Sequence, residues 1–159
     1  MSTYLVITGE PNWTRRAVHL AAAAAREAGA DVMLLHMVPV AHLEYLGAGA
    51  HEALLSFAEF DALNEYAETA AAYGVGAGVE LFEYSDFAGG VCCAADHFDA
   101  AAVFAAAPGG WLGRLRLWGL RRGLRRPLYT LGDGDPTITL AAPPEEATAT
   151  APQPAAITQ

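Results

Sequence analysis

The chain has 159 residues, of which 53% are hydrophobic, and a formal net charge of −9 at pH 7. This length and apolar content suit one globular domain and exclude a disordered chain, while the acidic balance argues against general nucleic-acid binding. The apolar runs are broken before the ~18 residues that a membrane span needs, and the N-terminus lacks the basic region of a signal peptide. We therefore expect a soluble, cytoplasmic protein without a transmembrane segment.

The first forty residues predict a strand, a helix and a second strand. Residues 3–8 are apolar and partly β-branched, which is typical of a short buried strand. Residues 13–28 have the composition of a helix, and Gly29 stands where a left-handed C-cap is favoured. Residues 31–39 form a second continuous apolar strand. This order is a βαβ unit, which implies parallel strands joined by a right-handed crossover.

The middle of the chain continues the same alternation. Residues 50–73 show the spacing of an amphipathic helix that covers one face of a sheet. Residues 79–84 alternate apolar and acidic side chains, as a strand at the edge of a sheet does. Residues 88–98 predict a short helix, and residues 101–106 predict another buried strand.

The last third consists of an arginine-rich helix, a fifth strand over residues 128–131 and a tail of different composition. Five strands alternating with four helices predict an α/β fold, an open doubly wound five-stranded parallel sheet with helices on both faces. We assign residues 1–132 to this domain and residues 133–159 to a tail rich in Pro, Ala and Thr. Within the tail, residues 137–140 could add one further strand.

Positive charge is concentrated in the last helix. The chain has no lysine, and no acidic residue lies between Asp99 and Asp133. Six of the nine arginines fall within thirteen residues of one another, at positions Arg114, Arg116, Arg121, Arg122, Arg125 and Arg126. A solvated helix face is the ordinary interpretation of such a run. A single anionic partner, bound at this one place, is the functional interpretation.

Apolar residues of the same helix favour a protein interface. One stripe consists of Leu117, Leu120 and Leu124, and a second consists of Trp111, Leu112, Leu115 and Trp118. Only one stripe can face the sheet, and exposed tryptophan among arginines is typical of a binding surface. Contact with phosphate or with an anionic membrane are the other functional interpretations. The predicted interface residues are Trp111, Arg114, Leu115, Trp118, Arg122 and Arg125.

The sequence resembles the universal stress protein family over residues 3 to about 132. Residues 34–36, Leu-Leu-His, match a run in the second strand of the family. Residues 100–131 resemble the family's last third, in which a strand, a Gly-rich loop, a helix, a proline and the last strand follow one another. The resemblance implies an adenine-nucleotide-hydrolase-like fold, a regulatory role and a homodimer formed through the last strand. It implies ATP or AMP as the ligand where one is bound.

Nucleotide-binding members of the family carry a Gly-X2-Gly-X9-Gly-Ser/Thr motif, in which glycines let the backbone approach phosphate. Two registers fit this chain: Ala106, Gly109, Gly119 and Leu120, or Gly110, Gly113, Gly123 and Leu124. Neither register keeps the hydroxyl of the Ser/Thr position. The second register places the motif too far into the predicted helix, so we prefer the first register. The resemblance then implies a degraded pocket, which nearby arginines could still supply with charge. Its residues would be Met37, Ala106, Gly109, Gly119, Leu120 and Arg121.

Three further positions depart from the family pattern. Gly9 stands where members carry an aspartate, and Ser85 and Phe87 stand where nucleotide-binding members favour glycine and proline. These differences also indicate a weakened nucleotide site.

No motif predicts catalysis or a metal. His42, Glu44, His51 and Glu52 match no ligand spacing, and His36 within a strand is typical of a hydrogen-bonded core histidine. Adjacent Cys92 and Cys93 are interpreted as small reduced side chains, at least one of them buried. We therefore expect a protein that is not an enzyme.

Two functional hypotheses remain open. The first is a universal-stress-type regulatory protein that binds adenine nucleotide weakly or not at all. The second is an accessory subunit of a larger protein complex, which docks through the Arg/Trp-rich helix and the tail and binds no nucleotide.

Overall fold

A six-stranded sheet forms the centre of the computed structural model, which describes residues 2–40, 56–106, 110–131 and 138–141. The strand order is β3-β2-β1-β4-β5-β6. The strands are β1 (Thr3–Ile7), β2 (Asp31–Pro39), β3 (Ala77–Tyr84), β4 (Ala100–Phe104), β5 (Leu128–Leu131) and β6 (Ile138–Ala141). The helices are α1 (Pro11–Ala28), α2 (Phe57–Ala71), α3 (Phe87–His97) and α4 (Gly110–Gly123).

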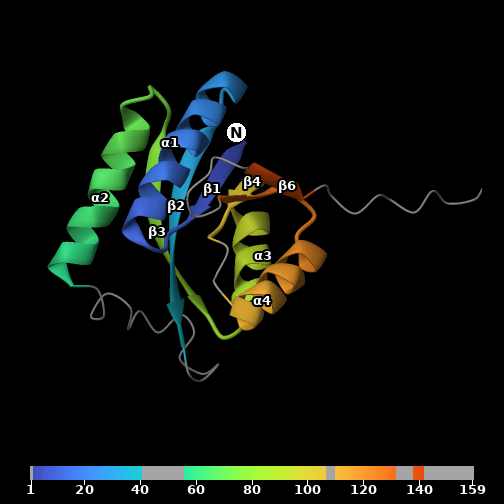
Figure 1. Cartoon of the computed structure of the whole chain (residues 1–159). Helices are drawn as coiled ribbons and strands as arrows, with labels where there is room; N and C mark the ends of the chain where they lie inside the picture. Colours follow the sequence, from blue (N-terminus) through green and yellow to red (C-terminus); the bar gives the residue numbers. More distant parts are fainter. Residues whose placement is uncertain (1, 41–55, 107–109, 132–137, 142–159) are drawn as a thin grey trace, which may run out of the picture.

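The helices cover both faces of the sheet. Helices α1 and α2 lie on one face, and α3 and α4 lie on the other (Figure 1). Two hydrophobic clusters correspond to these two layers: one gathers the buried face of α1 with part of α2, and the other gathers the buried faces of α3 and α4. The predicted α/β fold, with a doubly wound parallel sheet and helices on both faces, is confirmed.

The sheet extends beyond the five predicted parallel strands. Strands β1 to β5 pair in parallel, β3 forms one edge as its alternating pattern predicted, and β6 pairs with β5 in the antiparallel direction. β6 lies within the stretch that we assigned to the tail, one residue beyond the further strand considered for residues 137–140.

The predicted homodimer was expected to form through β5, the last of the five parallel strands. Because β6 pairs with β5, β5 is not an edge of the sheet. All four residues of β5 pair with β6, from Leu128 opposite Ala141 to Leu131 opposite Ile138. A dimer through the main chain of β5 would have to displace β6. The homodimer therefore stays a prediction, and β3 and β6 are the outer strands of the sheet.

Local caps explain where three of the helices begin and end. Helix α1 ends at Gly29, whose φ of 64° is the left-handed conformation that the sequence predicted. Helix α2 begins with a capping box between Ser56 and Glu59, later than the predicted start at residue 50. Residues 50–55 lie outside the described part of the chain. Asp86 caps α3 by accepting a hydrogen bond from the amide of Gly89 at 2.7 Å.

Candidate functional site

The carboxyl ends of β1 and β4 define the place where this fold can bind a ligand. The two strands are neighbours, and the helices that follow them, α1 and α4, lie on opposite faces of the sheet (Figure 1). Ligands of doubly wound sheets bind at such a switch point. Gly9 follows β1 and Ala106 follows β4, and a Cβ at Gly9 would lie 3.8 Å from the Cβ of Ala106.

The free backbone amides at the start of α1 already have hydrogen-bond acceptors within the protein, because side chains near the loop after β1 accept from them. The carboxylate of Glu10 accepts hydrogen bonds from the amides of Asn12 and Trp13, at 3.1 and 3.0 Å. The hydroxyl of Thr14 accepts a hydrogen bond from the amide of Gly9 at 2.9 Å. The amides of Trp13 and Asn12 lower the pKa of Glu10. A negative charge of the protein therefore occupies the helix end that would otherwise attract a phosphate.

His36 is hydrogen-bonded, as its position in the second strand predicted, but it is half-buried and does not belong to the core. Its Nδ1 lies 3.0 Å from the hydroxyl oxygen of Thr8, and that hydroxyl lies within donor distance of the carbonyl of Leu35, at 3.3 Å. The imidazole thus ties the end of β1 to β2. The next residue of β2, Met37, packs its side chain against the core beneath α3.

The position of α4 separates the residues of the predicted nucleotide motif. The helix begins at Gly110, so Gly119 is its tenth residue and Leu120 its eleventh. Amides that deep in a helix are bonded to carbonyls four residues earlier and are not available to a phosphate. The side chain of Leu120 is buried in the core, and that of Arg121 is exposed. The cradle would need Gly119 at the helix start, where it does not lie.

The structure describes five of the six predicted pocket residues, and these five are spread over β2, the loop after β4 and α4. Ala106 lies at the switch point, Met37 under α3, Leu120 in the core and Arg121 on the surface. Gly109 lies outside the described residues. Of this set, Gly119 alone lines one of the two clefts that we describe next.

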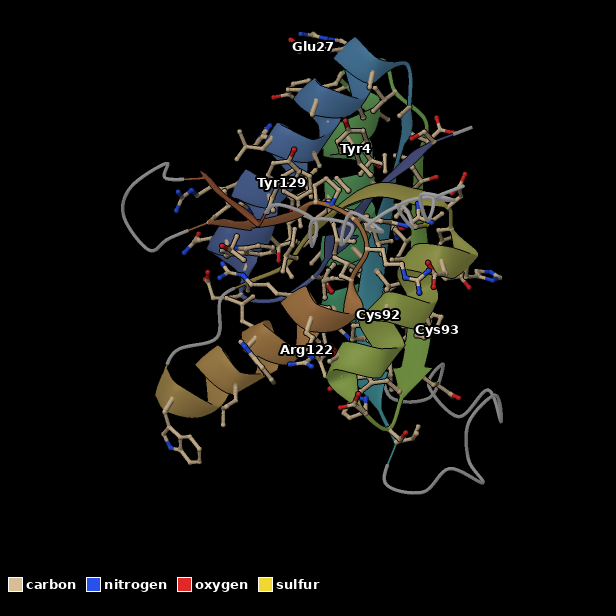
Figure 2. The ribbon with its side chains drawn as sticks, turned by 90° about the vertical axis from the view of Figure 1, so that its right-hand side faces the viewer. Tyr4, Glu27, Cys92, Cys93, Arg122 and Tyr129 are labelled. Carbon is tan, nitrogen blue, oxygen red and sulfur yellow. The ribbon has the colours of Figure 1, made fainter. Side chains whose placement is uncertain are left out.

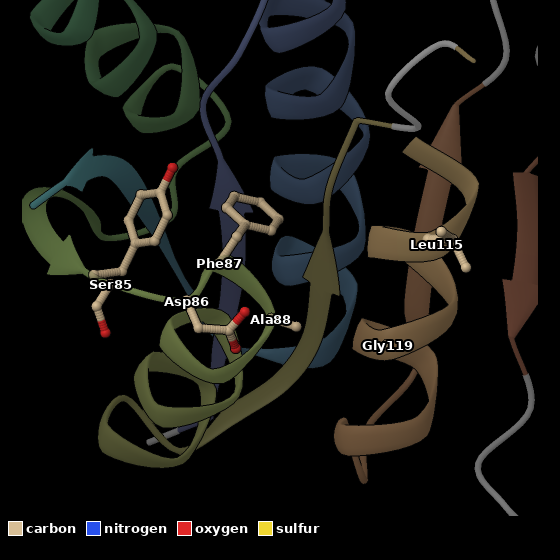
Figure 3. A pocket seen from close by; sticks show the side chains of 7 residues that line it. Ser85, Asp86, Phe87, Ala88, Leu115 and Gly119 are labelled. Carbon is tan, nitrogen blue, oxygen red and sulfur yellow. The ribbon is translucent and has the colours of Figure 1, made fainter. Parts of the chain in front are cut away.

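The first cleft, of about 380 Å³, lies between the start of α3 and α4 (Figure 3). Its lining residues are Tyr84, Ser85, Asp86, Phe87, Ala88, Leu115 and Gly119. The volume is at the lower end of what small-molecule sites have. Its charged side chain is the carboxylate of Asp86, which already caps α3. An acidic lining does not complement a phosphate group, so this cleft does not fit a nucleotide's phosphates.

The second cleft, of about 370 Å³, lies between α3 and the end of α4. Its lining residues are Cys92, Asp96, Gly123, Leu124, Arg125 and Arg126. Burial and the nearby carboxylates of Asp96 and Asp86 raise the pKa of Cys92, which makes its thiol a poor nucleophile. Cys92 is half-buried and Cys93 is exposed, so the expectation that at least one is buried is wrong. The outer side of α3 faces solvent.

Helix α4 divides its apolar residues between the core and the surface. Leu120 and Leu124 are buried against the sheet. On the opposite side Trp111 is 71%, Leu115 53% and Trp118 60% exposed. The two stripes that the sequence indicated therefore lie as expected, one on the sheet and one outward. The side chains of Leu112, from the second stripe, and of Arg114, from the predicted interface, are not among those described.

The arginines after Trp118 are of two kinds. Arg121, Arg122 and Arg125 are exposed, and none of them pairs with an acidic side chain of the described residues. The guanidinium of Arg122 lies over the ring of Trp118, 5.4 Å from its centroid. Arg122 is labelled in Figure 2. Arg126 differs, because its ion pairs to Asp96 and Asp99, at 3.6 and 3.2 Å, tie it to the end of α3.

Arg126 also donates to the carbonyl of Ala100, the first residue of β4. Its role is therefore structural, and charge alone did not distinguish it from its neighbours in the sequence.

Within the described ranges, no helix is long and apolar enough to cross a membrane. The same ranges contain no group of three or more His, Cys, Asp or Glu side chains placed to hold a metal ion. The loop with His42, Glu44, His51 and Glu52 lies outside those ranges.

Comparison with known proteins identifies the fold. No protein-family model and no curated protein sequence matches the chain. Among solved structures, a universal stress family protein from Burkholderia pseudomallei has 20% identity and a TM-score of 0.60, over 86% of this chain and 96% of that one. The universal stress protein from Archaeoglobus fulgidus in complex with dAMP has 15% identity and a TM-score of 0.60, over 82% and 96%.

A universal stress family protein from Arabidopsis thaliana with AMP bound has 14% identity and a TM-score of 0.55, over 82% of this chain and 90% of that one. The chain is thus an α/β protein with an open doubly wound sheet. More narrowly, its fold is that of the universal stress proteins, as the resemblance of its sequence implied. At these identities the similarity establishes the fold, and the bound nucleotides belong to those other proteins.

Proposed function

We propose that the chain is a universal-stress-type regulatory protein without catalytic activity, which acts by binding another protein chain through α4. In this proposal the adenine-nucleotide site is reduced, so that ATP or AMP binds weakly or not at all. The observation that carries the proposal is the exposed stripe of Trp111, Leu115 and Trp118 on α4. Large aromatic side chains left in solvent beside arginines are typical of protein interfaces.

The geometry of the switch point supports the reduced nucleotide site. Glu10 holds the amides at the start of α1 with a carboxylate, and Gly119 and Leu120 lie deep within α4. Glu10 therefore already occupies the start of α1, and Gly119 and Leu120 do not lie at the start of α4, while Gly109 lies outside the described residues. The described residues of the motif do not fit the phosphates of a nucleotide, and we derive no step through that group.

The absence of catalysis is supported by the partners of the candidate nucleophiles. The Thr8 hydroxyl beside His36 has a carbonyl acceptor, and the Cys92 thiol has a raised pKa. A nucleophile needs a base that is itself oriented and a lowered or assisted pKa. Neither group meets that requirement. The activities of other proteins with this fold do not indicate an activity of this chain, because function depends on the residues of the site.

Native mass spectrometry of the protein purified gently from its own cells tests the proposal. We expect the wild type to carry no nucleotide mass and to be accompanied by other protein chains. The variant Trp118→Ala should lose those chains, and the variant Leu20→Ala, which removes an exposed apolar side chain from α1, should keep them. A bound adenine nucleotide, or unchanged partners in Trp118→Ala, would contradict the proposal.

Solution binding of ATP and AMP gives a second measurement. A ligand at 100 times its Kd raises the free energy of unfolding by about 2.7 kcal/mol, which a thermal melt detects easily. We expect no such shift at micromolar nucleotide. The variant Glu10→Ala, which frees the amides of Asn12 and Trp13, should bind nucleotide no more weakly than the wild type.

A further inference from the structure

We infer that the partner of α4 is a second copy of this chain, which it contacts through α2. This inference rests on the proposed function, because it names the chain that the exposed stripe of α4 would bind. We define the α4 face as Trp111, Leu115, Trp118 and Arg122, and the α2 face as Phe57, Phe60, Asp61 and Glu68. Both faces are exposed, both carry aromatic side chains, and their charges are opposite.

The α2 face has more apolar surface than the fold uses. Phe57 is 92% and Phe60 55% exposed, while Leu63 and Tyr66 of the same helix are buried. Helical periodicity places Phe57, Phe60, Asp61 and Glu68 together on the side away from the sheet. The core that the described residues form is therefore complete without the two phenylalanines, and both side chains are exposed to a partner.

The charges of the two faces complement each other. Asp61 and Glu68 are exposed, and α2 has no basic residue in its last turn. Glu68 is thus near the negative end of its own helix, where a carboxylate is unfavourable and an incoming cation is favourable. Arg122 is exposed without an acidic partner among the described residues. Contact between α4 of one copy and α2 of another would satisfy both groups.

The spacing along the two helices also matches. Trp111 and Arg122 are eleven residues apart, and Phe57 and Glu68 are eleven residues apart. At about 1.5 Å per residue, each pair spans about 16 Å. A parallel alignment of the helices therefore places Trp111 beside Phe57 and Arg122 beside Glu68 in one register, with Leu115 near the second phenylalanine.

The contact has to form between molecules. Helices α2 and α4 cover opposite faces of the same sheet (Figure 1), so α4 cannot reach α2 of its own chain. Two different surfaces in contact make a heterologous interface, which produces a ring or an open chain of copies and not a closed dimer. One helix pair is smaller than a standard interface of about 800 Å² per partner, so we expect weak, concentration-dependent association.

Mixing two single variants tests the inference by sedimentation velocity. Trp118→Ala removes the centre of the α4 face, and Phe60→Ala removes the centre of the α2 face. We expect the wild type to form a series of oligomers as concentration rises, and each variant alone to stay monomeric. An equimolar mixture should form a dimer and stop there, because it contains one intact α4 face and one intact α2 face.

Charge reversal gives a matched control. Arg122→Glu and Glu68→Arg should each weaken association at least about tenfold, and the double variant in one chain should restore it, since the pair is only exchanged. Arg26→Glu and Glu27→Arg make the same changes of net charge in the last turn of α1, where Glu27 lies far from Arg122 (Figure 2), and should not weaken association. Circular dichroism verifies that every variant is folded.

Three results would overturn the inference. The first is a wild type that is monomeric at every concentration. The second is Phe60→Ala that still assembles while Trp118→Ala does not, which would mean that α4 binds some surface other than α2. The third is binding of the wild type to anionic vesicles without self-association. In each case the proposed function is decided separately, by the protein chains that accompany wild type and Trp118→Ala from the cell.

Discussion

Helices α1 and α4 occupy equivalent places in the sheet and use their apolar residues differently. Each follows a central strand at the switch point, on opposite faces. Helix α1 packs against the sheet mainly through small residues, since Ala17, Ala21, Ala22 and Ala25 are fully buried. Helix α4 packs through leucines and directs Trp111, Leu115 and Trp118 to solvent.

The apolar residues of α1 serve the stability of the fold, whereas those on the outer side of α4 do not. The apolar side of α1 is buried in the core, its start is capped by Glu10 and its end by Gly29. Helix α4 has more large apolar side chains than its contact with the sheet requires. Stability explains the first helix, but it leaves the outer side of the second unexplained. Function is therefore to be sought on α4.

The largest expected effect separates the two sides of α4. Leu120→Ala should lower the free energy of unfolding by about 2–5 kcal/mol, because it opens a cavity in the core. Trp118→Ala removes a larger but exposed side chain, and in dilute solution it should change stability by no more than about 0.5 kcal/mol. Urea unfolding measures both. Equal losses would mean that Trp118 packs against the domain and that the α4 face is not available to a partner.

A smaller effect is expected at the glycines where α3 packs closely. A Cβ at Gly90 would lie 2.7 Å from the Cβ of Tyr84 and 3.1 Å from Met37, so Gly90→Ala should destabilise by about 1–3 kcal/mol. A Cβ at Gly119 would meet the Cβ of Ala88 at an ordinary 3.8 Å, and Gly119→Ala should gain up to about 1 kcal/mol of helix propensity. Thermal melts of the two variants give the comparison.

The opposite ranking would contradict the packing described here. If Gly119→Ala were the more destabilising, α4 would lie closer to α3 than its contacts indicate. In that case the first cleft between them would also be smaller.

The spacing of apolar residues, together with the residues that end helices and strands, predicted most of the fold. The alternation of strands and helices, the edge position of β3 and the left-handed Gly29 follow from local patterns, which act over a few residues. The division of α4 into a buried and an exposed stripe was likewise visible at helical spacing. These features depend on which residues are near one another in the sequence.

The candidate site was less predictable, because it depends on where α4 begins. A shift of the helix start moves Gly119 from a phosphate cradle to the helix interior, and glycines in this segment fit the motif in two registers. Arg126 was indistinguishable by charge from Arg125, yet it alone among the described arginines of the cluster pairs with Asp96 and Asp99. Contacts between distant segments decide both outcomes.

The smallest expected effect concerns the start of α1. The amides of Trp13 and Asn12 lower the pKa of Glu10 below its ordinary value of 4.5 in the folded protein. The carboxylate therefore contributes stability that is fully present above the ordinary value and is lost as pH falls through the lower, folded value. Glu10→Gln should be slightly less stable than the wild type near pH 7, and the difference should vanish in acid.

Urea unfolding of both proteins across this pH range measures that contribution. Curves that stay parallel at every pH would mean that the Glu10 charge does not stabilise α1, and that the helix start is open to an external anion. The nucleotide interpretation would then regain support at the switch point, because the amides of Asn12 and Trp13 would be available to a phosphate. Curves that converge in acid would leave α4 as the functional surface and α1 as part of the scaffold.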